Sequence, residues 1–474
     1  MQLAVRTSRF DFRTSSLLLA ACLLLVFGLE SARAQPPAPA TWYVKFHLTG
    51  NQDGTSWASA YPNLDNVFAD QNFASGDQIW VAQGTYRPQN INLGFVVEKS
   101  VKIYGAFLGN ETSVATRGGL ATATILEGLD PVSGLNAPHV LKIGHATQYL
   151  SVLLDSVQIQ HGSATGGLRG GGVYSANTDL DLTNCIVTSN GADYEGGGLY
   201  VEGPGTGIAS TVHIVGCEFT SNHSWYLDGG AVLGSWVKGD ILNTNFVGNA
   251  SMGNGGALNL WNMGVGNPMT ITDCVFWNNA ANGTSALGGA VYLGGSSMSS
   301  FYGANATFVN CTMADNSMST CGAGQAVYVT TDAAVNSAIY NSILAANGGG
   351  TCGTSDPLAC PLALAVQYTD CWASSQGHAT HFGSGNIEVD PLFRNHALAG
   401  GLTLKVNSPC IDAADYLRVP TDLHDIDGNG VFLEPLPLDF LFQRRMVDRP
   451  EVDTGHSGST PGTTFLDMGA YEKP

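Results

Sequence analysis

Oxygen-bearing side chains alternate along the stretch Asp425-Ile426-Asp427-Gly428-Asn429-Gly430, near the C-terminal end of the chain. Carboxylates and amides at alternate positions with glycine beside them are typical of calcium-binding loops. An EF-hand would carry a glutamate where Leu436 stands, and no flanking helices are evident, so an Asx-rich turn without a metal is the alternative. A calcium ion here would be structural, and its candidate ligands are Asp422, Asp425, Asp427, Asn429 and Glu434.

Aromatic side chains recur at a second kind of position, on or just after apolar segments that follow paired glycines. The candidate ligand-binding rings are Tyr174, Tyr200, Trp236, Trp261, Tyr292 and Tyr328. A row of exposed rings suits sugar faces and protein surfaces, because each ring combines apolar area with a polar tip. The alternative is a row of rings that is buried beneath a long loop between strands.

Groups for acid–base catalysis are scarce. Lys238 is the only lysine or arginine between residues 170 and 393, Arg169 lies just before that range, and the imidazoles available are His213, His223, His378 and His381. A lyase acting on uronides needs a base and a cation, and a glycoside hydrolase needs clustered carboxylates. Asn177-Thr178-Asp179 repeats one tripeptide of polygalacturonases, but no Asp-Asp, Gly-His-Gly or Arg-Ile-Lys accompanies it. Asp179 and Asp181 therefore fit solvent-facing strand positions better than a catalytic pair, and we assign no catalytic residue.

The elements that position these side chains belong to a repeated unit of two apolar segments. Each unit opens on a glycine pair or a degraded one: Gly170-Gly171, Gly196-Gly197, Gly229-Gly230, Gly255-Gly256, Gly288-Gly289 and Gly324-Gln325. Each unit closes on an asparagine: Asn190, Asn222, Asn249, Asn279, Asn316 and Asn347. Neighbouring openers are 26, 33, 26, 33 and 36 residues apart, which indicates a stack of repeats.

The segments have the two-residue period of strands. In Thr272–Phe276, the side chains of Thr272, Cys274 and Phe276 share one face, which we expect to be the interior. The same face collects Val215, Cys217, Phe219, Leu242, Thr244, Phe246, Val309, Cys311 and Met313. The opposite face, suited to solvent or to a stack of amides, carries Asn184, Gly216, Asn245, Asp273 and Asn310. These patterns predict an all-β parallel β-helix, with a β-sandwich as the alternative.

The first 34 residues predict an export signal. Three arginines precede the apolar run from Leu17 to Leu29, and Ala32-Arg33-Ala34 suits cleavage after Ala34. A lipid-attachment site at Cys22 is the alternative. No later stretch approaches the ~20 apolar residues of a membrane span. We expect the mature chain to be extracellular or to lie at the cell surface or envelope.

The charge balance excludes one class of partner. The whole chain has a formal net charge of −19, and removal of the signal leaves 15 basic against 36 acidic residues, or −21. A nucleic-acid-binding surface must be basic to neutralise phosphates, so nucleic acid is not an expected partner. Divalent cations, glycans and proteins remain compatible with an acidic surface.

If the chain is exported, its cysteines can be either buried core residues or partners in disulfide bonds. Cys185, Cys217, Cys274 and Cys311 occupy one inward position in successive units, as expected of small core residues. Cys352 and Cys360 flank a proline-containing loop and are the expected disulfide in an oxidising compartment.

The chain is expected to have four parts. Residues 1–34 form the signal peptide, 35–150 the N-terminal cap and first coils, 151–393 the β-helix repeats, and 394–474 an irregular C-terminal extension. Within the cap, we expect a short helix near residues 64–70 and strands at 78–82 and 101–104.

Two families of repeat proteins share motifs with this chain. Segments 42–44, 54–58 and 76–86 resemble the opening of large exported bacterial right-handed β-helix proteins. The frequent ending of that family, Asp-x-Gly-Ala-Tyr-Glu, is matched by Asp467, Gly469, Ala470, Tyr471 and Glu472. The unit with Gly229-Gly230-Ala231, Phe246 and Asn249 is similar to repeats of chlamydial polymorphic outer-membrane proteins. The resemblance implies a right-handed parallel β-helix and export, but no particular activity.

The residues therefore favour a secreted or cell-surface binding and adhesion scaffold that contacts a polysaccharide or another surface partner, with possible structural calcium. The alternative is a polysaccharide lyase or glycoside hydrolase that acts on uronic-acid polymers. Because catalytic groups are scarce, the sequence favours a binding protein over an enzyme.

Overall fold

The computed structural model describes residues 38–474 apart from 47–51, 119, 206–207, 262–265, 295–304, 320–323, 331–336, 346, 348–357, 360–363, 373–382, 396, 398, 446–465 and 473–474. The predicted signal peptide and the predicted Cys352–Cys360 disulfide therefore lie outside the described residues. The chain divides into two units, Met1–Pro39 and Ala40–Pro474, and the fold below is that of the second unit.

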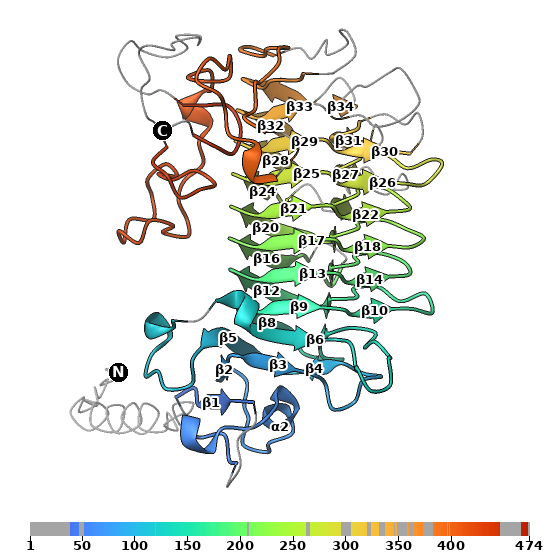
Figure 1. Ribbon diagram of the computed structural model, residues 1–474, viewed down its shortest axis with the longest axis vertical. Coiled ribbons are helices and arrows are strands. Elements are labelled where there is room, and N and C mark those ends of the chain that lie inside the picture. Colours follow the sequence, from blue (N-terminus) through green and yellow to red (C-terminus); the bar gives the residue numbers. More distant parts are fainter. Residues whose placement is uncertain are drawn as a thin grey trace, which may run out of the picture. The chain divides into compact units, whose positions relative to one another are not determined.

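The protein is a right-handed parallel β-helix, as predicted (Figure 1). Each coil contributes one strand to each of several parallel sheets that run along the axis, so neighbouring coils pair strand to strand. The coil that starts at β11 (Val173–Ala176) continues through β12 (Thr178–Thr183), β13 (Ile186–Thr188) and β14 (Gly191–Ala192) before β15 (Leu199–Glu202) begins the next coil.

The sheet that carries the candidate site has eleven strands and is called the long sheet below. Its strands, in spatial order, are β1 (Thr41–Val44), β2 (Gln78–Ala82), β5 (Val101–Phe107), β8 (Leu150–Asp155), β12, β16 (Ser210–Val215), β20 (Val237–Leu242), β24 (Met269–Thr272), β28 (Ala306–Val309), β32 (Ala338–Tyr340) and β35 (Ala365–Gln367).

Two nine-stranded sheets and one six-stranded sheet complete the coils. The sheet of the glycine-pair segments, called the aromatic sheet below, contains β34 (Leu358–Ala359), β31 (Val327–Val329), β27 (Val291–Gly294), β23 (Leu258–Trp261), β19 (Val232–Ser235), β15, β11, β7 (Leu141–Ile143) and β4 (Phe95–Val97). The second contains β3 (Gly84–Tyr86), β6 (Thr124–Glu127), β9 (Gln158–Gln160), β13, β17 (Glu218–Thr220), β21 (Asn245–Val247), β25 (Val275–Trp277), β29 (Thr312–Ala314) and β33 (Ile343–Ala345). The six-stranded sheet contains β10 (Ser163–Ala164), β14, β18 (His223–Ser224), β22 (Ala250–Ser251), β26 (Ala280–Ala281) and β30 (Ser317–Met318).

Helices are short. The expected N-terminal helix is α2 (Leu64–Phe68), where the side chain of Asn63 accepts a hydrogen bond from the backbone N–H of Leu64. The 3₁₀ turns are η1 (Trp57–Ser59), η2 (Val114–Thr116), η3 (Ala121–Ala123), η4 (Ala399–Gly401) and η5 (Tyr416–Arg418).

The predicted interior register is wrong at one position in each unit. Asp273 has a φ of 52°, in the left-handed region, so the chain turns there and β24 ends at Thr272. Residues of the same conformation end the long-sheet strand in the other coils: Asn184, Gly216, Asn243, Asn310 and Asn341. Asparagine, aspartate and glycine tolerate this conformation, and it interrupts the strand alternation. Ile271, Cys274 and Phe276 therefore face the core, whereas Thr272 shares the outer face with Thr270.

The same correction applies along the stack. Cys217, Phe219, Thr244, Phe246, Cys311 and Met313 are buried, as predicted. Val215, Leu242 and Val309 lie instead on the outer face of the long sheet, because Ile214, Ile241 and Phe308 occupy the core positions beside them. The turn position in the coil after β20 is held by Asn243 and not by Asn245.

Like side chains stack on like along the interior. The rings of Phe219 and Phe246 have centroids 5.3 Å apart and those of Phe246 and Phe276 4.6 Å apart, both nearly parallel. Cys185, Cys217, Cys274 and Cys311 are buried free thiols, as expected of core residues.

The closing asparagines form a buried ladder. Nδ2 of Asn249 donates to the backbone oxygen of Phe219 (2.9 Å) and to Oδ1 of Asn279 (3.0 Å). Oδ1 of Asn249 accepts from the backbone N–H and from Nδ2 of Asn222. The amide of each rung thus satisfies its own polar atoms and those of its neighbour, which a buried amide requires.

The C-terminal extension returns along the stack beside the long sheet (Figure 1). Asn341, at the turn after β32, exchanges hydrogen bonds with the backbone of Asp415. Further back, Arg445 pairs with Asp273, and both side chains are fully buried. Asp273 is therefore not the solvent-facing residue that the strand alternation predicted, because the extension covers it.

Candidate functional site

A cavity of about 490 Å³ lies between the outer face of the long sheet and residues 420–436 of the extension. The strands β16, β20 and β24 supply polar side chains to it: Thr211, His213, Lys238, Asp240, Thr270 and Thr272. The extension supplies mainly apolar side chains: Pro420, Leu423, Leu433 and Leu436, with His424 among them. A concave site with apolar walls and a few polar groups is the usual form of a small-ligand site.

Strand alternation and register place the polar side chains in rows. Asp181, His213, Asp240 and Thr270 are register partners on four successive coils. Parallel strands lie about 4.8 Å apart, so consecutive members of the row are side-chain neighbours. Gly239 lies between two outward residues of β20 with a φ of 128°, and a Cβ there would meet the backbone oxygen of Val212 at 2.2 Å.

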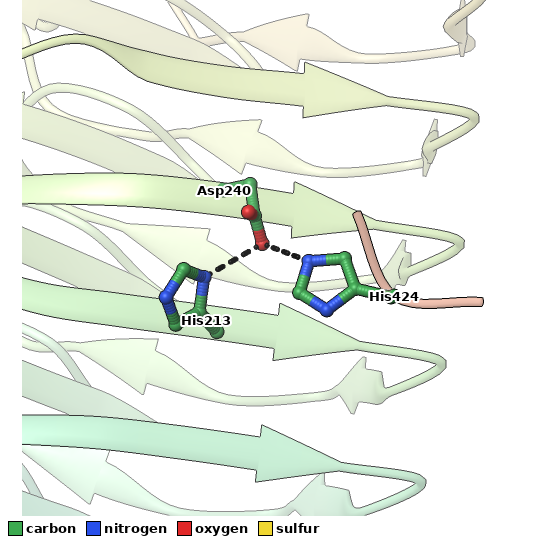
Figure 2. A group of neighbouring side chains, drawn as sticks. All are labelled: His213, Asp240 and His424. Atoms are coloured by element: carbon green, nitrogen blue, oxygen red, sulfur yellow. Dashed lines mark hydrogen bonds and ion pairs between the residues drawn. The ribbon is translucent and has the colours of Figure 1, made fainter. Parts of the chain in front are cut away.

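Three side chains converge at the centre of this row (Figure 2). Oδ1 of Asp240 lies 3.0 Å from Nδ1 of His213 and 3.0 Å from Nε2 of His424. The contact with His424 is a hydrogen bond, whereas Nδ1 of His213 makes a close ion-pair contact without an aligned hydrogen bond. The side chain of His213 is 34% exposed, that of Asp240 18% and that of His424 25%, so the group is accessible from the cavity.

The group is electrostatically coupled. Burial alone would raise the pKa of Asp240, but the two histidines outweigh burial and lower it to about 2. The contact with Asp240 raises the pKa of His213 by more than burial lowers it. Burial raises the pKa of Asp181, the preceding member of the row. Asp181, His213 and Asp240, an imidazole between two carboxyl groups with all three pKa values shifted, therefore lie on three adjacent coils.

Asp179 and Asp181 lie on the outer face of β12, as predicted, but both are half-buried. Oδ1 of Asp179 accepts hydrogen bonds from the hydroxyl of Tyr149 (2.8 Å) and the backbone N–H of Thr211 (2.6 Å). Asp179 therefore joins two coils and Tyr149, and it does not face solvent freely.

The four tyrosines share one register row of the aromatic sheet, which Leu233 and Asn259 interrupt, whereas Trp261 lies two residues further along β23. Tyr174 stacks on Tyr200 with centroids 5.6 Å apart, Tyr292 stacks on Tyr328 at 5.7 Å, and Trp261 stacks on Tyr292 at 6.3 Å. Tyr200 and Tyr292 are only 5% and 6% exposed. Trp236 is half-buried at the turn between β19 and β20. Ring faces that contact one another leave mainly edges for a ligand.

Three of the five predicted calcium ligands come together in the extension. One side-chain oxygen from each of Asp422, Asp427 and Glu434 lies within 4.8 Å of the other two. Both oxygens of Asp422 accept backbone hydrogen bonds, and Oδ1 of Asp425 accepts one from Gly430. Asn429 donates to Asp427 and Glu434. This geometry fits both an Asx-rich turn and a calcium loop.

No sequence motif marks the group at the centre of the cavity. His213 is one of four imidazoles between residues 170 and 393, and no local pattern distinguishes Asp240 or His424. Asp240 and His424 are 184 residues apart, and no motif joins them. The period-two pattern on β16 and β20 could have placed His213 and Asp240 on one outer face, but the return path of the extension could not be read in this way.

No protein-family model matches the chain, and no curated protein matches it. Solved structures that are similar to it include a pectate lyase, Pel9A, at 12% identity, covering 92% of this chain and 98% of that chain with a TM-score of 0.45. A deglycosylated pectin methylesterase from Aspergillus niger is 14% identical over 69% of this chain and 91% of its own, with a TM-score of 0.36. The PL6 family alginate lyase AlyGC is 11% identical over 74% of this chain and 54% of its own, with a TM-score of 0.27.

These neighbours are parallel β-helix proteins, so the likeness concerns the fold. The resemblance of the chain's ending and repeats to particular exported families stays a prediction. None of the helices in the described residues has the length and hydrophobicity to cross a bilayer.

Proposed function

We propose that this protein is an exported β-helix scaffold that binds an acidic polysaccharide in the cavity between the long sheet and the extension. The observation that carries the proposal is the concentration of cationic groups there. Lys238 is the only lysine or arginine between residues 170 and 393 in a chain of net charge −19, and it lines the cavity with His213 and His424. A carboxylate on a sugar would be drawn to this point of an otherwise acidic surface.

The remaining lining suits a sugar chain. Hydroxyl groups of Thr211, Thr270 and Thr272 can exchange hydrogen bonds with sugar hydroxyls, and Leu423 and Leu433 can pack on the apolar faces of the rings. Leu433 is 85% exposed and Leu423 61%, which is unusual for large apolar side chains unless something covers them. Export through the predicted signal peptide would place this surface where polysaccharides occur.

A second candidate function is cleavage of the bound polymer. It is favoured by the adjacency of His213 to Asp240 and by the raised pKa of Asp181. An imidazole held by a carboxylate can take the proton next to a uronate carboxylate, and a protonated carboxyl can donate to the leaving oxygen. Binding requires only the cations, whereas cleavage requires both titrating groups.

The test is a retention assay with polygalacturonate, alginate and neutral glycans, each with chelator and with calcium. We expect retention of the acidic polymers and a several-fold loss of affinity in Lys238→Ala, whereas Lys405→Ala, an exposed lysine outside this cavity and the aromatic sheet, should behave as wild type. Equal retention of neutral and acidic polymers, or unchanged binding by Lys238→Ala, would refute the proposal.

The same samples decide between binding and turnover. New reducing ends or unsaturated uronides would show an enzyme, and their absence with retention would show a binder. Joint replacement of Trp236 and Trp261 by Ala tests the aromatic row as the binding surface. Loss of retention in that variant alone, with an unchanged melt, would move the site to the aromatic sheet.

A further inference from the structure

The central group of the cavity has the composition of a metal site. We propose that His213, Asp240 and His424 bind one divalent transition-metal ion of the zinc class. One nitrogen or carboxylate oxygen from each residue lies within 4.8 Å of the other two. Two imidazoles and a carboxylate are a common ligand set of zinc, which takes such ligands at about 2.0–2.2 Å.

The scaffold brings the three ligands from two directions. His213 and Asp240 are register partners on β16 and β20, so the sheet fixes their separation. His424 approaches from the extension and meets the same oxygen of Asp240 (Figure 2). Each nitrogen is already 3.0 Å from that oxygen, and two ligands of one tetrahedral ion would be about 3.3 Å apart at zinc distances. Small side-chain rotations would therefore admit the ion.

The carboxylate of Asp240 and the two imidazoles beside it are also compatible with a bound cation. In the described part of the chain, the ion-pair partners of Asp240 are both imidazoles, which balance its charge only when protonated. Asp181, the register partner of His213, is a further oxygen-bearing side chain in the row. A divalent ion would take the place of protons on the two coordinating nitrogens and release them into solvent, so the cavity would still attract a carboxylate.

The chemistry of the donors separates this site from the calcium prediction nearby. Imidazole nitrogens favour zinc, nickel, copper and cobalt, whereas calcium prefers oxygen ligands alone. Asp422, Asp427 and Glu434 offer only oxygen atoms. The two groups should therefore take different ions.

The remaining coordination position would face the cavity, because all three ligands line it. Three protein ligands with one open position are typical of zinc sites that bind a further molecule, whereas structural zinc sites are closed by four. If the proposed function holds, that position is suited to an oxygen of the acidic polysaccharide. The metal site itself does not depend on the identity of the ligand.

The experiment titrates the chelator-stripped full chain with ZnCl₂ and CoCl₂ by calorimetry, with the visible absorption of cobalt as a readout of coordination. We expect one equivalent of zinc, a cobalt spectrum of nitrogen and oxygen ligation, and at least a tenfold loss of affinity in His424→Ala and in Asp240→Asn. His223→Ala removes an imidazole of β18 outside the group and should bind zinc as wild type does.

Two outcomes would overturn the proposal. One is the absence of stoichiometric zinc binding by the wild type. The other is zinc binding that survives in His424→Ala and is lost in Asp427→Asn, which would place the ion in the oxygen cluster of the extension. Melting curves in chelator show whether each variant is folded. Polysaccharide retention measured in chelator separates failure of this site from failure of the proposed function.

Discussion

At the scale of single residues, Asp370 is a fully buried carboxyl that follows β35. Its oxygens accept hydrogen bonds from the backbone N–H of Val389 and from Sγ of Cys410, each at 3.3 Å. Burial raises its pKa to about 8, and the hydrogen bonds offset only part of that shift. The carboxyl is therefore more stable in the fold with its proton than without it.

Replacement of Asp370 by Asn should make stability less dependent on pH. A group whose pKa is raised by folding stabilises the fold fully below its unfolded value, near 3.8, and this contribution is lost as the pH rises through about 8. We expect the variant to melt several degrees above the wild type at pH 8 and close to it at pH 4. Glu218→Gln, which changes an exposed glutamate on β17, is the control. An equal loss of melting temperature at both pH values would mean that the carboxylate is ionised and bound.

Single residues also show where sequence reasoning stops. The alternation of β12 placed Asp179 and Asp181 on an outer face correctly. The same alternation does not predict that Asp273 is buried. The residue that covers it, Arg445, is 172 residues further along the chain. The residues of an irregular segment do not follow a periodic pattern, so their contacts cannot be predicted from periodicity. The group around Asp240 is not predictable for the same reason, because His424 belongs to the extension.

At the scale of elements, the stacked unit was predictable because its signals are local. Glycine pairs, closing asparagines and apolar alternation repeat in each coil, and neighbouring coils pair in parallel register as expected. The error in the interior positions came from the turn between two sheets. A single residue in the left-handed region changes the parity of all residues before it, and a strict two-residue period does not detect such a residue.

Phe276 tests the corrected interior. It is fully buried and stacks on Phe246, so Phe276→Ala should lower the free energy of unfolding by about 3–5 kcal/mol. Thr270→Ala, on the outer face of β24, should change stability little. Denaturant unfolding measures both, and an unchanged melt for Phe276→Ala would contradict the assignment of the core.

The extension provides a second test at this scale, for the calcium proposal. If Asp425, Asp427 and Asn429 bind calcium, the ion stabilises only the folded loop, and a chelator should lower the melting temperature. Asp427→Ala should remove that sensitivity. Identical melts of the wild type in chelator and in excess calcium would leave an Asx-rich turn without a metal.

At the scale of the whole molecule, a solenoid is held together mainly by contacts between neighbouring coils. The extension adds contacts of another kind, because it reaches the turn after β32 at Asn341, the turn after β24 at Asp273, and β20 at Asp240. It therefore joins the coil of β32 to the coils of β20 and β24, which are not its direct neighbours. Loss of the extension should therefore weaken several coils together and open the cavity at the same time.

The Arg445–Asp273 pair has a consequence for when the C-terminal extension can dock during synthesis and folding. During synthesis, Asp273 emerges long before Arg445, and until then its carboxylate can remain hydrated on the outside of the coils. Once the pair is enclosed, removal of one partner leaves a charge without water, which costs about 3–5 kcal/mol. Docking of the tail is thus a late event that is hard to reverse. The outer end of β24 therefore stays uncovered until the segment around Arg445 has been made and has docked.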